Sequence, residues 1–93
     1  MEPVAIFPYY KVEQEISATG LSKWEDKRYL RLYPTVLETK HRQFPTKDIL
    51  DLSYRAMDGE AGMLYLHTSS GMFTYLVKTS PHKFIEKALR YIG

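Results

Sequence analysis

The chain has 93 residues, a length that suits one domain spanning residues 1–93 rather than two. It contains no cysteine, which excludes disulfides and thiolate metal sites and agrees with a reducing compartment, so we expect a cytoplasmic protein. A net charge of +2 is too small to favour nucleic acid by itself, and no stretch approaches the ~20 apolar residues of a membrane span.

Residues 1–8 are expected to form an N-terminal arm of undefined structure. Apolar and polar side chains then alternate in short runs, which is the pattern of half-buried strands. Such runs occur over residues 10–16, 27–33, 36–40, 48–55, 63–68 and 72–79. Residues 40–45 either continue the third strand or form a short fourth one, and a loop is predicted over residues 20–26. Turns are predicted at Asp58-Gly59 and at Ser69-Ser70-Gly71.

The last stretch of the chain has the pattern of one amphipathic helix over residues 81–92. Ser80 suits the N-cap, Pro81 suits the first helical position, and Gly93 suits the position after the last turn. Apolar side chains recur at helical spacing and form one stripe, made of Phe84, Ile85, Ala88, Leu89 and Ile92. A single striped helix needs a sheet to bury it, so we expect the whole stripe, Leu89 included, to pack against strands.

These elements predict an α+β fold. Six to seven short strands joined by tight turns favour an antiparallel arrangement. A small sheet of this kind exposes its edges unless it curls or is capped. We therefore expect a bent sheet or open barrel that is closed by the C-terminal helix.

The order of the elements resembles the pleckstrin-homology family. Residues 24–32 followed by residues 36–40 look like that family's second and third strands, with a tryptophan, basic residues and an aromatic–aliphatic run. Residues 44–52 and 80–89 are similar to the entry to the fifth strand and to the final helix of its small bacterial members. The resemblance covers roughly residues 9–93 and implies a pleckstrin-homology-like fold. It does not extend to the family's phosphoinositide pattern, which has a basic residue at the position of Asp26, where a carboxylate repels phosphate.

Basic side chains of the second and third predicted strands form the candidate ligand-binding set. These are Lys23, Lys27, Arg28, Lys40 and Arg42. Such a cluster suits an anionic lipid headgroup or a phosphorylated ligand. The alternative is a solvated strand face that is balanced by Glu25, Asp26 and Glu38. Eight tyrosines suit base stacking as well, but the low positive charge does not favour nucleic acid as a partner.

The hairpin over residues 63–79 supplies a second candidate surface. It has apolar or aromatic side chains on both faces, and one helix cannot cover all of them. The residues expected to form an exposed interaction surface are Met63, Tyr65, Met72, Phe73 and Tyr75. Exposed apolar patches usually mark contacts with other proteins, and open strand edges pair readily.

No motif for catalysis or for a metal is evident. His41, His67 and His82 lack the spacing of metal ligands, and no serine has a nucleophile elbow. We therefore expect no catalytic residue, no metal and no cofactor. The sequence favours a non-catalytic interaction or scaffold module that binds another protein or a second copy of itself. The alternative is a weak binder of an anionic membrane surface or a phosphorylated ligand.

Overall fold

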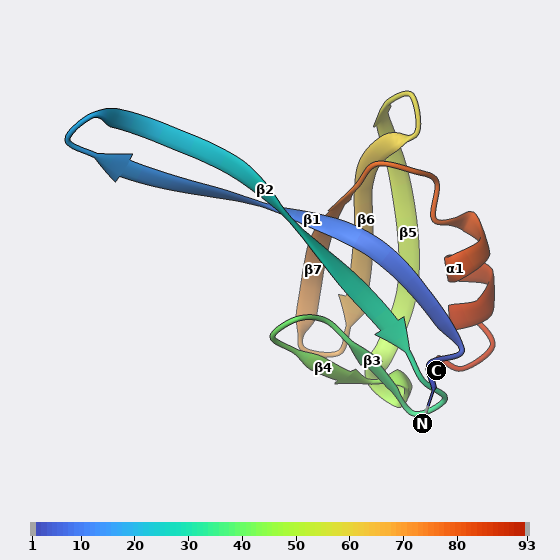
Figure 1. The fold of residues 1–93 in the computed structure, drawn as a ribbon. Coiled ribbons are helices and arrows are strands. Elements are labelled where there is room, and N and C mark those ends of the chain that lie inside the picture. The colour runs from blue at the N-terminus through green and yellow to red at the C-terminus, as the bar shows by residue number, and fades with distance from the viewer. Residues whose placement is uncertain (1, 93) are drawn as a thin grey trace.

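The protein is described by a computed structural model, which covers residues 2–92 and shows a seven-stranded antiparallel sheet with one helix (Figure 1). The strands are β1 (Ala5–Ser17), β2 (Gly20–Leu32), β3 (Val36–Glu38), β4 (Gln43–Pro45), β5 (Ile49–Asp58), β6 (Ala61–Thr68) and β7 (Gly71–Val77). A short 3-10 turn, η1 (Thr46–Asp48), precedes β5, and the helix α1 (His82–Ala88) follows β7. The predicted α+β class with a C-terminal helix is confirmed.

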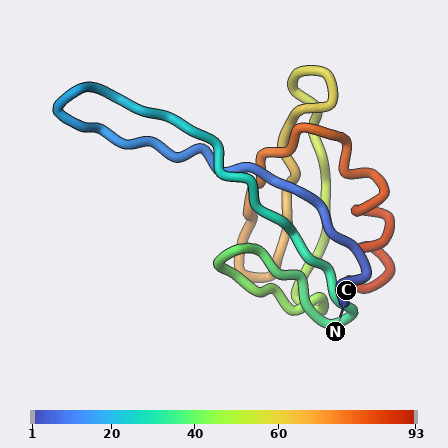
Figure 2. The backbone as a smooth tube through the Cα atoms, viewed as in Figure 1, coloured from blue at the N-terminus to red at the C-terminus, as the bar shows by residue number. Residues whose placement is uncertain are grey.

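Strand β1 joins two meanders, because the strand order is β4-β3-β2-β1-β7-β6-β5. It pairs with β2 along its whole length, whereas in the described part of the chain its pairing with β7 is limited to Tyr10 opposite Leu76. The backbone of the two meanders curves around a common interior (Figure 2). The helix α1 contacts β1 and β5, which are not neighbours in the sheet. The helix therefore covers an opening of the bent sheet.

Both meanders contribute to one apolar core. In β6, the side chains of Leu64 and Leu66 are buried while the residues between them are partly exposed, because successive strand residues face opposite sides. The largest fully buried aliphatic side chains are Leu30, Leu32, Leu37, Ile49, Leu64, Leu66 and Val77. The two halves of the chain thus share one apolar interior.

The helix is shorter than predicted, and its apolar stripe is narrower. Pro81, not Ser80, occupies the N-cap position, and no side chain of residues 2–92 caps the helix. Phe84 and Ala88 are buried, whereas Leu89 is 51 % exposed, so the prediction that Leu89 is buried was wrong. At about 100° per residue, Leu89 lies roughly 140° around the helix from Phe84 and falls at the solvent edge of the stripe. The predicted stop at Gly93 lies outside the described residues.

The largest difference from the predicted elements lies at residues 20–26, which form strand and not loop. Residues 5–8 of the predicted arm also belong to β1. We name residues 11–26 the β1–β2 extension; they continue the ladder from the pair Lys11↔Asp26 to the turn at Ala18 and Thr19. The extension runs out from the rest of the molecule in Figure 1. Residues 20–26 do not pack on a core with either face, so this part of the sequence lacks the alternation that a buried face imposes.

Candidate functional site

The predicted basic set does not form one free cationic patch. The Arg28 guanidinium donates one hydrogen bond to Asp26 (2.8 Å) and one to Glu13 (3.0 Å). The Lys40 ammonium lies 3.2 Å from the same Asp26 carboxylate. These hydrogen bonds, from Arg28 first and Lys40 second, hold the pKa of Asp26 below its ordinary value. Asp26 thus offsets two of the five predicted cations in addition to opposing an incoming phosphate.

The other basic residues are divided between two faces of β2. Lys23 and Lys27 lie on the face opposite Arg28, because consecutive residues of a strand alternate. The Lys27 ammonium lies 5.6 Å from the centre of the Tyr29 ring on that face. Arg42, from the segment between β3 and β4, lies with its guanidinium 4.9 Å from the centre of the Phe73 ring. The set therefore offers separate cations rather than one converging site.

Members of both predicted sets do meet in one hollow of about 540 Å³, beside the start of the extension. Its lining includes Arg28 and Arg42 from the basic set, and Met72, Phe73 and Tyr75 from the predicted interaction surface. The hollow combines aromatic rings with guanidinium groups, so it suits an anion that also carries an apolar part.

The predicted interaction surface is split by the strand register. Met63 faces Leu76 and Tyr65 faces Thr74 across the ladder, on the side of the sheet opposite the core. The rings of the other two aromatic residues of the set pack inward. Phe73 lies 4.9 Å from buried Phe44, and Tyr75 lies 4.9 Å from buried Tyr9, centre to centre. The five residues therefore do not form one patch.

Tyr75 gives a pH-dependent prediction. Burial, followed by its neighbour Tyr9, raises the pKa of Tyr75 to about 12. Between pH 10 and pH 12 the unfolded chain releases this proton while the folded chain keeps it, so the free energy of unfolding falls as the pH rises. Tyr75 is only partly buried and solvent screens part of this effect, so we expect this one group to account for a fall of about 1 kcal/mol. Urea unfolding of the wild type and of Tyr75→Phe at several pH values should show a shallower fall in the variant; equal falls would contradict the assignment.

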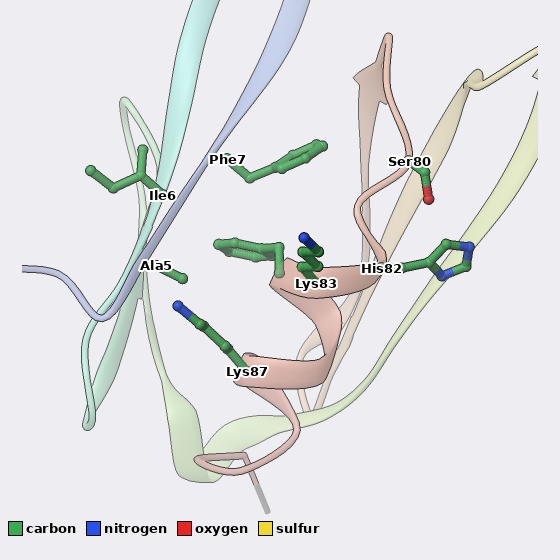
Figure 3. Close-up of a pocket in the computed structure, with 8 residues that line it drawn as sticks. Ala5, Ile6, Phe7, Ser80, His82, Lys83 and Lys87 are labelled. Carbon is green, nitrogen blue, oxygen red and sulfur yellow. The ribbon is translucent and has the colours of Figure 1, made fainter.

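A second hollow, of about 530 Å³, lies between the start of β1 and the helix α1 (Figure 3). Phe7 points toward the helix, and its ring centre lies 5.8 Å from that of Phe84. Lys83 and Lys87 lie at its rim. Ser80 also lines it, and the buried Ser80 hydroxyl has no hydrogen-bond partner among residues 2–92. This groove has an aromatic floor and a cationic rim.

The β1–β2 extension carries large apolar side chains that are open to solvent. Ile16 is 81 % exposed, Leu21 is 55 % exposed, and Trp24 is 48 % exposed. Ile16 and Leu21 face each other across the ladder on one side, while Trp24 faces Glu13 on the other. Sequence reasoning missed this surface because it placed residues 20–26 in a loop. The signal in the sequence that would have revealed this surface is a turn ending at Gly20 with an apolar residue on each side, Ile16 and Leu21, which are typical of a hairpin.

One serine–histidine contact exists outside these surfaces. The Ser53 hydroxyl and the Nε2 atom of His67 lie 3.2 Å apart across β5 and β6. A nucleophile needs a base that a third group orients, and a place for the substrate. In the described part of the chain no hydrogen bond joins Asp51 to this histidine, although the two residues are paired in the ladder. Neither Ser53 nor His67 lines the two hollows described above.

Residues 2–92 contain no group of three or more histidine or acidic side chains arranged to hold a metal ion. Within the same residues, no helix has the length and apolar character required to cross a membrane. No family model matches the sequence, and no curated protein and no solved structure is significantly similar to it.

Proposed function

We propose that the chain is a non-catalytic, cytoplasmic protein-interaction module of pleckstrin-homology-like form. The order of seven strands followed by a C-terminal helix supports this form. The absence of cysteine from the sequence supports a reducing compartment.

The observation that carries the proposal is the β1–β2 extension. A two-stranded hairpin is at best marginally stable in water without a third strand or a packed face. This extension nevertheless holds Ile16, Leu21 and Trp24 in the open. Burying a large apolar side chain contributes about 1.5–3 kcal/mol, so a partner that covers the extension gains substantial free energy. An exposed ribbon with these side chains is therefore suited to contact with a protein.

A comparison of captured proteins tests the proposal. The wild-type chain is immobilised beside the variant Ile16→Ser/Leu21→Ser, and proteins retained from the native host are compared. The control is Leu50→Ser, because Leu50 on β5 is 67 % exposed but lies outside the extension. We expect the wild type and the control to retain the same proteins and the extension variant to lose them. Equal retention by all three chains would contradict the proposal.

Anion binding is the second candidate, since Arg28 and Arg42 line the hollow beside Phe73. Asp26 weakens this candidate because it already bonds to Arg28 and Lys40. Sedimentation with vesicles of anionic lipid distinguishes the two functions, since exposed charges are screened over ~10 Å at 0.1 M salt. We expect marginal binding. Micromolar binding in physiological salt that is lost on Lys40→Glu/Arg42→Glu would replace the proposal with this second function.

A further inference from the structure

The outer edge of β2 is open along most of its length. On one side, β2 pairs with β1 from Gly20 to Leu32. On the other side, in the part of the chain that the structure describes, β2 pairs with β3 only at Arg31 and Leu32. An unpaired edge presents a row of backbone donors and acceptors to another strand. In the extension this edge stands clear of the rest of the molecule (Figure 1).

We propose that this edge pairs antiparallel with the same edge of a second copy of the chain, about a two-fold axis at Trp24. The inference rests on the proposed interaction function and names its partner and contact. It joins two hairpins into one four-stranded sheet, which meets the number of strands that an independent sheet needs. A two-fold contact of this kind uses the same surface on both copies.

The charges of β2 complement each other about Trp24. In this register Lys23 lies directly opposite Glu25 of the second copy, and Glu25 lies opposite the second copy's Lys23. Directly opposed side chains of a ladder lie about 4.5–5.5 Å apart at Cβ, and opposite charges there are stabilising. Glu25 also accepts a hydrogen bond from Lys78 of its own chain, so each new pair extends an existing contact.

The neighbouring registers are unfavourable. Opposed residues must lie on the same face of the new sheet. The two-fold axis therefore runs midway between the two copies of one residue, and we name each axis by that residue. An axis at residue 23 sets Lys23 against itself, and an axis at residue 25 sets Glu25 against itself and Lys23 against Lys27. Axes at residues 26 and 27 set Asp26 or Lys27 against itself. Among axes at residues 23–27, only the one at Trp24 opposes unlike charges without opposing like ones.

The apolar side chains agree with the same register. Trp24 meets Trp24 of the second copy at the axis, where two aromatic rings add to the contact. Leu21 lies opposite Lys27 of the second copy and diagonal to its Tyr29, so the exposed Leu21 packs on an aliphatic stem and a ring. The tip of each extension thereby lies beside the base of the other copy's extension, near its Asp26 and Lys27.

The opposite edge of the extension, on β1, is a poorer match. Axes at residues 13 and 15 set a glutamate against itself, and the axis at residue 14 sets Glu13 against Glu15 twice. An axis at Val12 opposes unlike charges but needs the edge of Tyr10, which already pairs with Leu76. An axis at Ile16 opposes no charged pair of either kind, so it lacks the complementarity found on β2. Self-pairing is thus assigned to β2.

Charge reversal tests the register. Sedimentation velocity over a wide concentration range is expected to show a monomer–dimer equilibrium for the wild type. In a dimer of Lys23→Glu, both pairs of positions 23 and 25 hold two glutamates. In a dimer of Glu25→Lys, both pairs hold two lysines. Each variant should therefore raise the dimer Kd by roughly tenfold or more. A mixture of these two variants restores both unlike pairs and should dimerise as the wild type does. The control is Lys83→Glu on α1, which should leave the Kd unchanged.

Cysteine cross-linking tests the same contact with only one of the two positions changed in each chain. The chain has no native cysteine, so each variant carries a single thiol. Lys23→Cys mixed with Glu25→Cys should form a mixed disulfide dimer, because these positions are directly opposed. Lys23→Cys alone should cross-link far less, since its two copies would lie roughly 8 Å apart, beyond the usual Cα separation of a disulfide.

A wild type that is monomeric up to near-millimolar concentration overturns the inference. So does a dimer whose Kd is unchanged by both single charge reversals, or one in which Lys23→Cys cross-links as readily alone as in the mixture. These failures are distinguishable from failure of the proposed function, because sedimentation measures this chain alone and the capture experiment measures other proteins. If the wild type is a strict monomer but captures proteins that the variant Ile16→Ser/Leu21→Ser does not, the inference fails and the proposed interaction function stands.

Discussion

Replacement of Phe84 by alanine is expected to lower the free energy of unfolding by about 3–5 kcal/mol. Phe84 is 4 % exposed, and its ring packs against Phe7 of β1. The loss combines the apolar surface that is removed from the core with the cavity that remains beneath α1. A domain of this size has a total stability of about 5–15 kcal/mol, so the loss is a large share of it.

Leu89→Ala is the matched control, because Leu89 lies on the same segment but is half exposed. Its replacement should cost less than about 1 kcal/mol. Urea unfolding of both variants measures the difference, with an unchanged slope showing that the unfolded states are comparable. Equal losses for the two variants would show that α1 does not close the core through Phe84.

Replacement of Gly62 by alanine is expected to cost about 3 kcal/mol or more. Gly62 lies in β6 opposite Ala56 of β5, beside the irregularity of the ladder between Ala56 and Asp58. A Cβ atom at this position would overlap the Arg55 carbonyl oxygen and would lie 2.9 Å from the Ala56 Cα atom. Both are backbone atoms, so β5 itself must move to admit a methyl group.

Gly59→Ala is the control that separates the steric clash at Gly62 from the cost of replacing any glycine in the chain. A Cβ atom at Gly59 meets nothing within 4 Å, but the residue has a φ of +61°, which costs a side chain about 1–2 kcal/mol. The smaller loss should therefore come from Gly59→Ala and the larger from Gly62→Ala, measured by urea or thermal unfolding. The reverse order would mean that β5 moves aside without cost.

The parts of the fold that were predicted from the sequence are those with one buried face. Leu64 and Leu66 alternate with partly exposed residues in β6, and burial of one face is what produces that pattern. Phe84 was placed correctly because a helical stripe identifies its central residues. Leu89, at the margin of the stripe, was not, because the width of the buried face depends on the sheet that the helix meets.

The candidate site was predicted less well, because sequence position does not show which side chains share a face. Lys27 and Arg28 are adjacent in the chain but lie on opposite faces of β2. The expected repulsion of phosphate by Asp26 did not reveal that Asp26 bonds to Arg28 and to Lys40, a residue from another part of the sheet. Contacts of this kind depend on the register between strands, which the sequence pattern leaves open.

The single pairing of Tyr10 with Leu76 has a consequence for folding during synthesis. Each meander is built from strands that follow one another in the chain, so each can form from local contacts as it leaves the ribosome. The joint between them brings the first and the seventh strand together, and α1, which contacts both β1 and β5, is translated after all seven strands. Until then the inner face of the first meander is uncovered, and a nascent chain stalled before residue 76 exposes apolar surface that chaperones recognise.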